Sequence, residues 1–298
     1  MQMRDDLGIT TKLENGKAYL EFALPEKIGR LLSALQIEIW EGAEGKRLVF
    51  HGEYSSEEAD SMTALLLRPH LWDGMRDPYV YLVKAQGRFR SVEYGEKMGG
   101  MEKEEKLDPA EDITGEVEMY WRQELTIYDV RVVEKKGILL NEKEFLPHEV
   151  VYRLPPQISD AGTRVEQVRR DLERLVQMGV NVIRLEGTGT GAEGVNCSEV
   201  RTFYSLCRKR GFLTGDLWIR PENLPVYRGL PGETTCQALL AADGRTLTER
   251  YYYYQAKWSS EPVLYPVLST LHRQENGLLS LTIYSNQKKV VLYVEGVL

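Results

Sequence analysis

Short stretches of alternating apolar and polar residues dominate the first 134 residues of the chain. Seven such stretches are separated mostly by glycine, proline or charged residues that favour turns. Alternation with a period of two is typical of strands that bury one face. The pattern predicts an immunoglobulin-like antiparallel β-sandwich over residues 1–134. The predicted strands are 17–24, 34–42, 46–54, 61–69, 79–87, 117–125 and 126–133. The acidic, glycine-rich stretch 94–112 interrupts them and predicts an exposed, mobile loop.

A helical pattern follows in the second half of the chain. A helix is predicted from Thr163 to Met178, because Thr163 and Glu166 have the spacing of a capping box and Gly179 follows as a stop. Its apolar face is predicted to consist of Val165, Val168, Leu172, Leu175 and Val176.

Strands and a second helix surround this helix in the sequence. Residues 137–146 predict a hairpin, 180–185 a buried strand, 198–210 a helix and 211–218 a further strand. Strand–helix–strand is the unit of a parallel sheet. The pattern therefore predicts an α/β domain after the sandwich.

In the last third of the chain, the sequence predicts a loop, then helices, then strands. Residues 221–235 are rich in proline and glycine and predict a loop, and 236–243 a short helix. The final strands are predicted at 261–272, 278–286 and 288–298. Between 236–243 and these strands, TERYYYYQAKW at 248–258 predicts a helix. Four consecutive helical residues point to all sides, so the tyrosines are interpreted as a buried seam between domains. Direct contact with a sugar is the alternative.

Composition narrows the class of partner. The net charge of −7 argues against a nucleic acid or an anionic membrane, since both require a basic surface. The sequence contains no run of 18 apolar residues and begins without an apolar segment, so neither a membrane span nor a signal peptide is expected. The three cysteines suggest reduced thiols in a cytoplasmic protein. Histidine and cysteine spacing predicts no metal site, and no cofactor is expected.

Two acidic residues follow predicted strands of the α/β domain. Glu186 ends one strand and Asp216 the next, and the carboxyl ends of parallel strands face the ligand site in such folds. Arg184 lies two positions before Glu186 and is expected on the same face. The alternative is that these charges line a solvated rim or pair with each other.

A glycine-rich segment is a further candidate for a ligand-binding site. GTGTGA, residues 187–192, follows a strand and precedes a helix, as in loops that bind a pyrophosphate. The predicted helix begins only near residue 198, and the domain is too short for a six-stranded dinucleotide fold. A flexible loop is therefore the simpler interpretation.

Several stretches together resemble glycoside hydrolase family 2, the β-galactosidase and β-glucuronidase family. RRDLERLVQMGVNVIRL, residues 169–185, is similar to the family's first barrel helix and second strand, and is the most specific match. YDVRVVEKKGILLNEKEFL resembles the junction into the barrel, with Glu142 where the family has a glycine. The other similar stretches are 68–85, 206–218, 251–267 and 281–296.

The resemblance implies a truncated enzyme. It implies an immunoglobulin-like sandwich over 1–134, a truncated TIM-barrel-like domain over 135–258 and a short, partial C-terminal β-sandwich segment over 259–298. A closed barrel needs about 200 residues or more. The family's two catalytic-glutamate motifs have no counterpart in this sequence. An open partial barrel exposes apolar surface, so a homodimer that covers it, or cover by the terminal strands, is expected.

Three functions follow as hypotheses. The first is a catalytically inactive protein that binds a carbohydrate or serves in assembly, with Arg184, Glu186, Asp216 and Trp218 lining the remnant cleft. The second is an active β-glycosidase in which Glu186 and Asp216 form a rebuilt carboxylate pair, since retaining enzymes need two carboxyls about 5–5.5 Å apart. The third is a nucleotide-binding module that uses GTGTGA.

Overall fold

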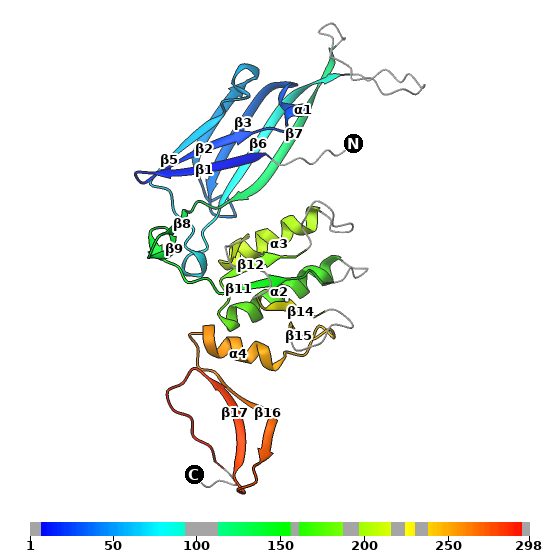
Figure 1. The fold of residues 1–298 in the computed structure, drawn as a ribbon. Coiled ribbons are helices and arrows are strands. Elements are labelled where there is room, and N and C mark those ends of the chain that lie inside the picture. The colour runs from blue at the N-terminus through cyan, green and yellow to red at the C-terminus, as the bar shows by residue number, and fades with distance from the viewer. Residues whose placement is uncertain are drawn as a thin grey trace. The chain divides into compact units, whose positions relative to one another are not determined.

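The structure is a computed structural model that describes residues 7–92, 113–155, 161–186, 197–215, 224–229 and 238–293 (Figure 1). The chain divides into two compact units. The first comprises residues 1–72 and 79–130, and the second comprises 73–78 and 131–298. The predicted loop 94–112 lies outside the described residues.

Two antiparallel sheets form the first unit. One is three-stranded in the order β1-β2-β5, and the other is four-stranded in the order β4-β3-β6-β7. Short helical turns, α1 (Glu26–Gly29) and η1 (Ser56–Glu58), connect some of the strands. The strands are β1 (Gly8–Glu14), β2 (Lys17–Ala23), β3 (Leu32–Glu41), β4 (Arg47–Ser55), β5 (Thr63–Leu67), β6 (Tyr81–Val92) and β7 (Ile113–Leu125).

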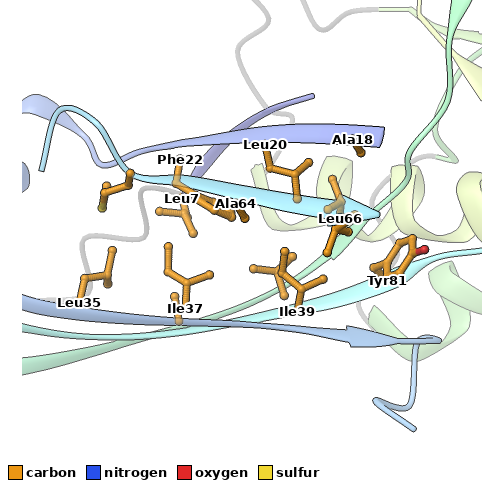
Figure 2. Close-up of a cluster of buried hydrophobic side chains, with 14 of the residues drawn as sticks. Leu7, Ala18, Leu20, Phe22, Leu35, Ile37, Ile39, Ala64, Leu66 and Tyr81 are labelled. Carbon is orange, nitrogen blue, oxygen red and sulfur yellow. The ribbon is translucent and has the colours of Figure 1, made fainter. Parts of the chain in front are cut away.

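The core of the first unit lies between these two sheets. Leu20 and Phe22 of β2 point into it from one sheet, and Leu35, Ile37 and Ile39 of β3 from the other (Figure 2). All five are buried, and burial of a large aliphatic or aromatic side chain contributes about 1.5–3 kcal/mol. The strict alternation in β2 and β3 thus produces two facing sheets, as the sequence predicted.

Two features of the first unit differ from the prediction. Strand β1 was not predicted, although Asn15-Gly16 joins it to β2 through a turn in which both residues have positive φ (50° and 72°). The seventh predicted strand, 126–133, does not belong to the sandwich. Its second half is β8 (Val130–Val133), which lies in a separate three-stranded sheet with β9 (Gly137–Leu140) and β10 (Lys143–Glu144). The boundary therefore falls at residue 130, and η2 (Gly74–Arg76) belongs with the second unit.

A five-stranded parallel sheet organises the second unit. Its order is β13-β12-β11-β14-β15, and every recorded pairing is parallel. The strands are β11 (Glu149–Tyr152), β12 (Val182–Leu185), β13 (Leu213–Thr214), β14 (Val226–Arg228) and β15 (Ala238–Leu240). The α/β prediction is confirmed. The strand order departs from the simple succession of a truncated barrel, because β14 lies beside β11 and not beside β13.

Two segments of this sheet were predicted wrongly. Strand β14 lies inside the predicted loop 221–235, and β15 lies inside the predicted helix 236–243. Both strands have three residues and are mostly or fully buried. Runs this short carry no periodicity that separates a strand from a helix.

In the described part of the second unit, three helices accompany the sheet: α2 (Ala161–Met178), α3 (Cys197–Arg210) and α4 (Glu249–Trp258). Helix α2 contacts both α3 and α4, and all three share one apolar cluster with the sheet. Because α2 begins at Ala161, Thr163 lies inside its first turn and the predicted capping box is wrong. Val176 is 39% exposed, and Met178 is buried in its place. Gly179 ends the helix with φ of 87°, as predicted. No described helix has the length and apolar character that a membrane crossing requires.

The tyrosine run forms the seam between α4 and its neighbours. Tyr251 is buried, and its hydroxyl donates to the carbonyl of Arg174 on α2 at 2.8 Å. Tyr252 stacks on Tyr265 of β16 (Leu264–Arg273) with ring centroids 3.9 Å apart. Tyr253 meets a tyrosine of β17 (Leu279–Ser285) edge to face. The run thus joins the α/β core to the β16–β17 hairpin within one compact unit. The predicted seam is buried only at Tyr251, since Tyr253 is 37% exposed.

The third predicted C-terminal strand, 288–298, is not formed in its described part. Residues 288–293 are in no strand, and 294–298 lie outside the described residues. The hairpin β16–β17 is therefore the whole of the C-terminal β structure in the described part of the chain.

Candidate functional site

The carboxyl ends of the parallel strands carry a charged rim. Glu186 follows β12, and its side chain is 46% exposed. It accepts hydrogen bonds from Arg153, which follows β11: Nε donates to Oε2, and Nη2 donates to Oε1 at 3.3 Å. Arg153 Nη1 also donates to the backbone carbonyl of Arg228 at the end of β14, at 3.2 Å. One guanidinium thus links the ends of three strands.

Arg153 was not recognised in the sequence. It lies directly after the buried strand β11, which the sequence analysis did not identify as a strand. An arginine at a strand end, in the stretch VVYRLP, is the signal that was available. The prediction that Glu186 lies at the carboxyl end of a parallel strand is confirmed by the pairing of β12 with β11.

Arg184 has a different partner from the one the sequence suggested. Its Nε donates to Glu149 Oε1 at 3.0 Å, and the Glu149 side chain is fully buried. Val150 and Tyr152 of the same strand belong to the apolar cluster shared with the helices, so Glu149 faces the opposite side of the sheet. The idea that Arg184 pairs with Glu186 is therefore wrong. Arg184 pairs with Glu149 in β11, and Glu186 pairs with Arg153 directly after β11.

A buried polar network supports the rim from beneath. Asp171 of α2 is 1% exposed and accepts from Tyr152 at 2.9 Å, Tyr227 at 3.0 Å and Arg228 Nη2 at 2.6 Å. Burial, followed by the charge of Asp171, raises the pKa of the Tyr152 phenol well above its usual value, and the Tyr227 phenol is raised for the same two reasons. Both phenols therefore stay neutral donors. Arg228 connects this network to Arg153 through its carbonyl.

Two predicted site residues lie outside the described part of the chain. Asp216 and Trp218 both fall there, as does the GTGTGA segment at 187–192. The structure does confirm that β12 and β13 are neighbours, with Ile183 opposite Thr214. Within the described residues, no cluster of three or more His, Cys, Asp or Glu side chains has the geometry of a metal site.

Comparison with known proteins identifies no family. No protein-family model and no curated protein matches the chain. Similar solved structures are β-glucuronidases from Ruminococcus gnavus. The complex with uronic deoxynojirimycin is 19% identical with a TM-score of 0.46, and the match covers 71% of this chain and 29% of that one. The complex with D-glucuronic acid is 18% identical with a TM-score of 0.44, covering 70% and 29%.

This chain therefore spans less than a third of the length of those β-glucuronidases. The identities lie below one fifth and the TM-scores below 0.5, so the similarity assigns neither a site nor a function to this chain.

Proposed function

We propose that the chain is a glycoside-hydrolase-family-2-like protein that binds a carbohydrate at the charged rim without hydrolysing it. The ion pair between Arg153, which is 18% exposed, and the half-exposed Glu186 carries the proposal. A carboxylate beside a guanidinium offers acceptors and donors to neighbouring sugar hydroxyls, and charge-assisted hydrogen bonds are stronger than neutral ones. The sequence stretches that resemble the family, 169–185 above all, give the reason to test sugars first.

The described carboxylates of this unit that lie near the rim are already paired with arginines, which argues against hydrolysis. A retaining glycosidase needs one carboxylic acid that donates a proton and a second carboxylate about 5–5.5 Å away. Glu149, Asp171 and Glu186 each accept a hydrogen bond from an arginine, and the first two are buried. Glu149 and Asp171 are therefore out of reach of a substrate, and Glu186 is held by Arg153, while Asp216 lies outside the described residues.

The test combines calorimetry with turnover measurements. Methyl β-glucuronide, β-galactoside, β-glucoside and β-mannoside are titrated into the wild-type protein and into Glu186→Gln. Glu173→Gln is the matched control, because Glu173 is also paired with an arginine at the surface, Arg210, and is 53% exposed. We expect at least tenfold weaker binding in Glu186→Gln and unchanged binding in the control. Binding that is absent, or equal in both variants, would refute the rim as a sugar site.

The turnover measurement separates binding from hydrolysis. Aryl derivatives of the same four β-glycosides are incubated with the wild-type protein, and we expect no release of the aryl group. Release that is lost in Glu186→Gln would establish the rebuilt carboxylate pair of an active glycosidase instead. The nucleotide hypothesis stays a prediction, and dinucleotide binding in the same calorimeter would support it. The homodimer also stays a prediction, for light scattering to test.

A further inference from the structure

The β16–β17 hairpin has two different faces. Tyr265 and Tyr284 are direct cross-strand partners, and both rings contact tyrosines of α4. Because side chains alternate along a strand, the residues next to these two tyrosines lie on the opposite face. We call this the outer face of the hairpin. It is formed by apolar residues, none of which is buried: Leu264, Pro266, Leu279, Leu281 and Ile283.

The outer face is open to solvent. Leu264 and Leu279 are 61% and 69% exposed. In the described part of the chain, β16 and β17 pair only with each other, so both edges of the hairpin are also open. A hairpin of two strands is marginally stable by itself, and a sheet normally buries an apolar face against another element. The outer face therefore has the character of a docking surface.

The exposed apolar surface is large enough for a stable interface. The large apolar side chains in and directly after the hairpin that are at least 41% exposed offer on the order of 500 Å². A standard interface buries about 800 Å² of each partner, and a little over half of this area is apolar. One such surface on each of two copies meets this requirement. The side chains are Leu264, Leu268, Leu271, Leu278, Leu279, Val290, Val291, Leu292 and Tyr293.

The charges at the two ends of the hairpin favour a second copy as the partner. Glu275 lies in the turn at the tip, whereas Lys288 and Lys289 follow β17 at the base, and all three are exposed. Asn286 Nδ2 donates to the Glu261 carbonyl at 2.6 Å, which holds the residues before the lysines at the base. If two hairpins pack with the tip of one over the base of the other, each glutamate meets the two lysines of its partner. Packing of tip over tip would bring like charges together.

We propose that the hairpin is a homodimer interface, in which the outer faces of two copies pack against each other with tip over base. The interface is isologous, because each copy contributes the same residues, and it closes as a two-fold dimer. It differs from the homodimer expected from the sequence, which would cover the open α/β sheet. It does not depend on sugar binding at the rim.

Sedimentation equilibrium on the full chain tests the apolar part of the interface. We expect the wild-type protein to dimerise with a Kd in the micromolar range or below. Leu279→Lys adds a charge to the outer face and should weaken the dimer at least tenfold. Leu67→Lys in β5 is the matched control, because Leu67 is 67% exposed, and it should leave the Kd unchanged. A monomeric wild-type protein, or a dimer that Leu279→Lys leaves unchanged, would overturn the proposal.

An exchange of charges tests the arrangement of the two copies. Glu275→Lys, and separately Lys288→Glu with Lys289→Glu, place like charges at both ends of the dimer, so each variant alone should dimerise at least tenfold more weakly at low salt. An equal mixture of the two variants restores opposite charges at both ends and should dimerise as the wild type does. A mixture that dimerises no more tightly than either variant alone would overturn the packing of tip over base.

Discussion

The buried carboxylate of Asp171 gives the sharpest test of how the α/β unit is stabilised. It is 1% exposed and accepts three hydrogen bonds, one of them from Arg228, whose side chain is 6% exposed. Asp171→Asn keeps the size of the side chain and an acceptor for one tyrosine. It removes the charge that compensates the buried guanidinium.

The magnitude follows from the cost of an uncompensated buried charge. Breaking a buried ion pair by removing one partner costs about 3–5 kcal/mol. The asparagine retains part of the hydrogen bonding, so we expect a loss near the lower end, about 3 kcal/mol. Glu173→Gln, two residues along the same helix, breaks an exposed pair with Arg210 and should cost at most about 1 kcal/mol.

Urea denaturation followed by far-ultraviolet circular dichroism measures both variants. This signal reports mainly on α2, α3 and α4, which all belong to the second unit, so the unfolding of that unit dominates. A loss below about 1 kcal/mol for Asp171→Asn would refute the reasoning. It would show that the Arg228 guanidinium finds other compensation when the carboxylate is removed.

Three further predictions concern single positions. Glu142 has φ of 67° in the β9–β10 turn, so Glu142→Gly should stabilise the protein by about 1 kcal/mol in urea denaturation, and a loss would contradict this. A Cβ at Gly179, where φ is 87°, would lie 2.3 Å from the Trp258 carbonyl oxygen. Gly179→Ala should therefore lower the free energy of unfolding in urea by more than about 1 kcal/mol. An unchanged free energy of unfolding would contradict the close approach of the two backbones. Burial raises the pKa of Tyr251 to about 12, so its contribution to stability is complete below pH 10, its usual pKa, and is lost as the pH rises towards 12. Tyr251→Phe should make this alkaline decline shallower, and thermal melts from pH 9 to 12 that match the wild type would rule the effect out.

Much of the secondary structure was predictable because it rests on local periodicity. The alternation in β2 and β3 and the glycine stops of α2 and α3 act within a few residues. The three-residue strands β14 and β15 were missed because tertiary burial, and not local pattern, makes them strands. The position of β14 beside β11 depends on a pairing across 75 residues, between Val151 and Val226, which no local pattern encodes.

The site was predictable to a lesser degree, for a related reason. The sequence placed Glu186 correctly, because a residue after a buried parallel strand lies at the carboxyl edge. It gave no sign that Glu149 and Asp171 are buried, since acidic residues are rarely buried unless a partner compensates them. Those partners, Arg184 and Arg228, lie 35 and 57 residues away along the chain.

The buried network and the rim form one connected chain of contacts, which gives a final prediction. Asp171 holds the Arg228 guanidinium, the Arg228 carbonyl accepts from Arg153, and Arg153 donates to Glu186. Asp171→Asn should therefore weaken sugar binding as well as stability, whereas Glu186→Gln should weaken binding and leave stability unchanged. Because both act through Arg153, the double variant should bind no more weakly than Glu186→Gln. Affinity losses that add in the double variant would show that Asp171 affects binding by a route independent of Glu186, and unchanged binding in Asp171→Asn would show that the rim needs no support from the core.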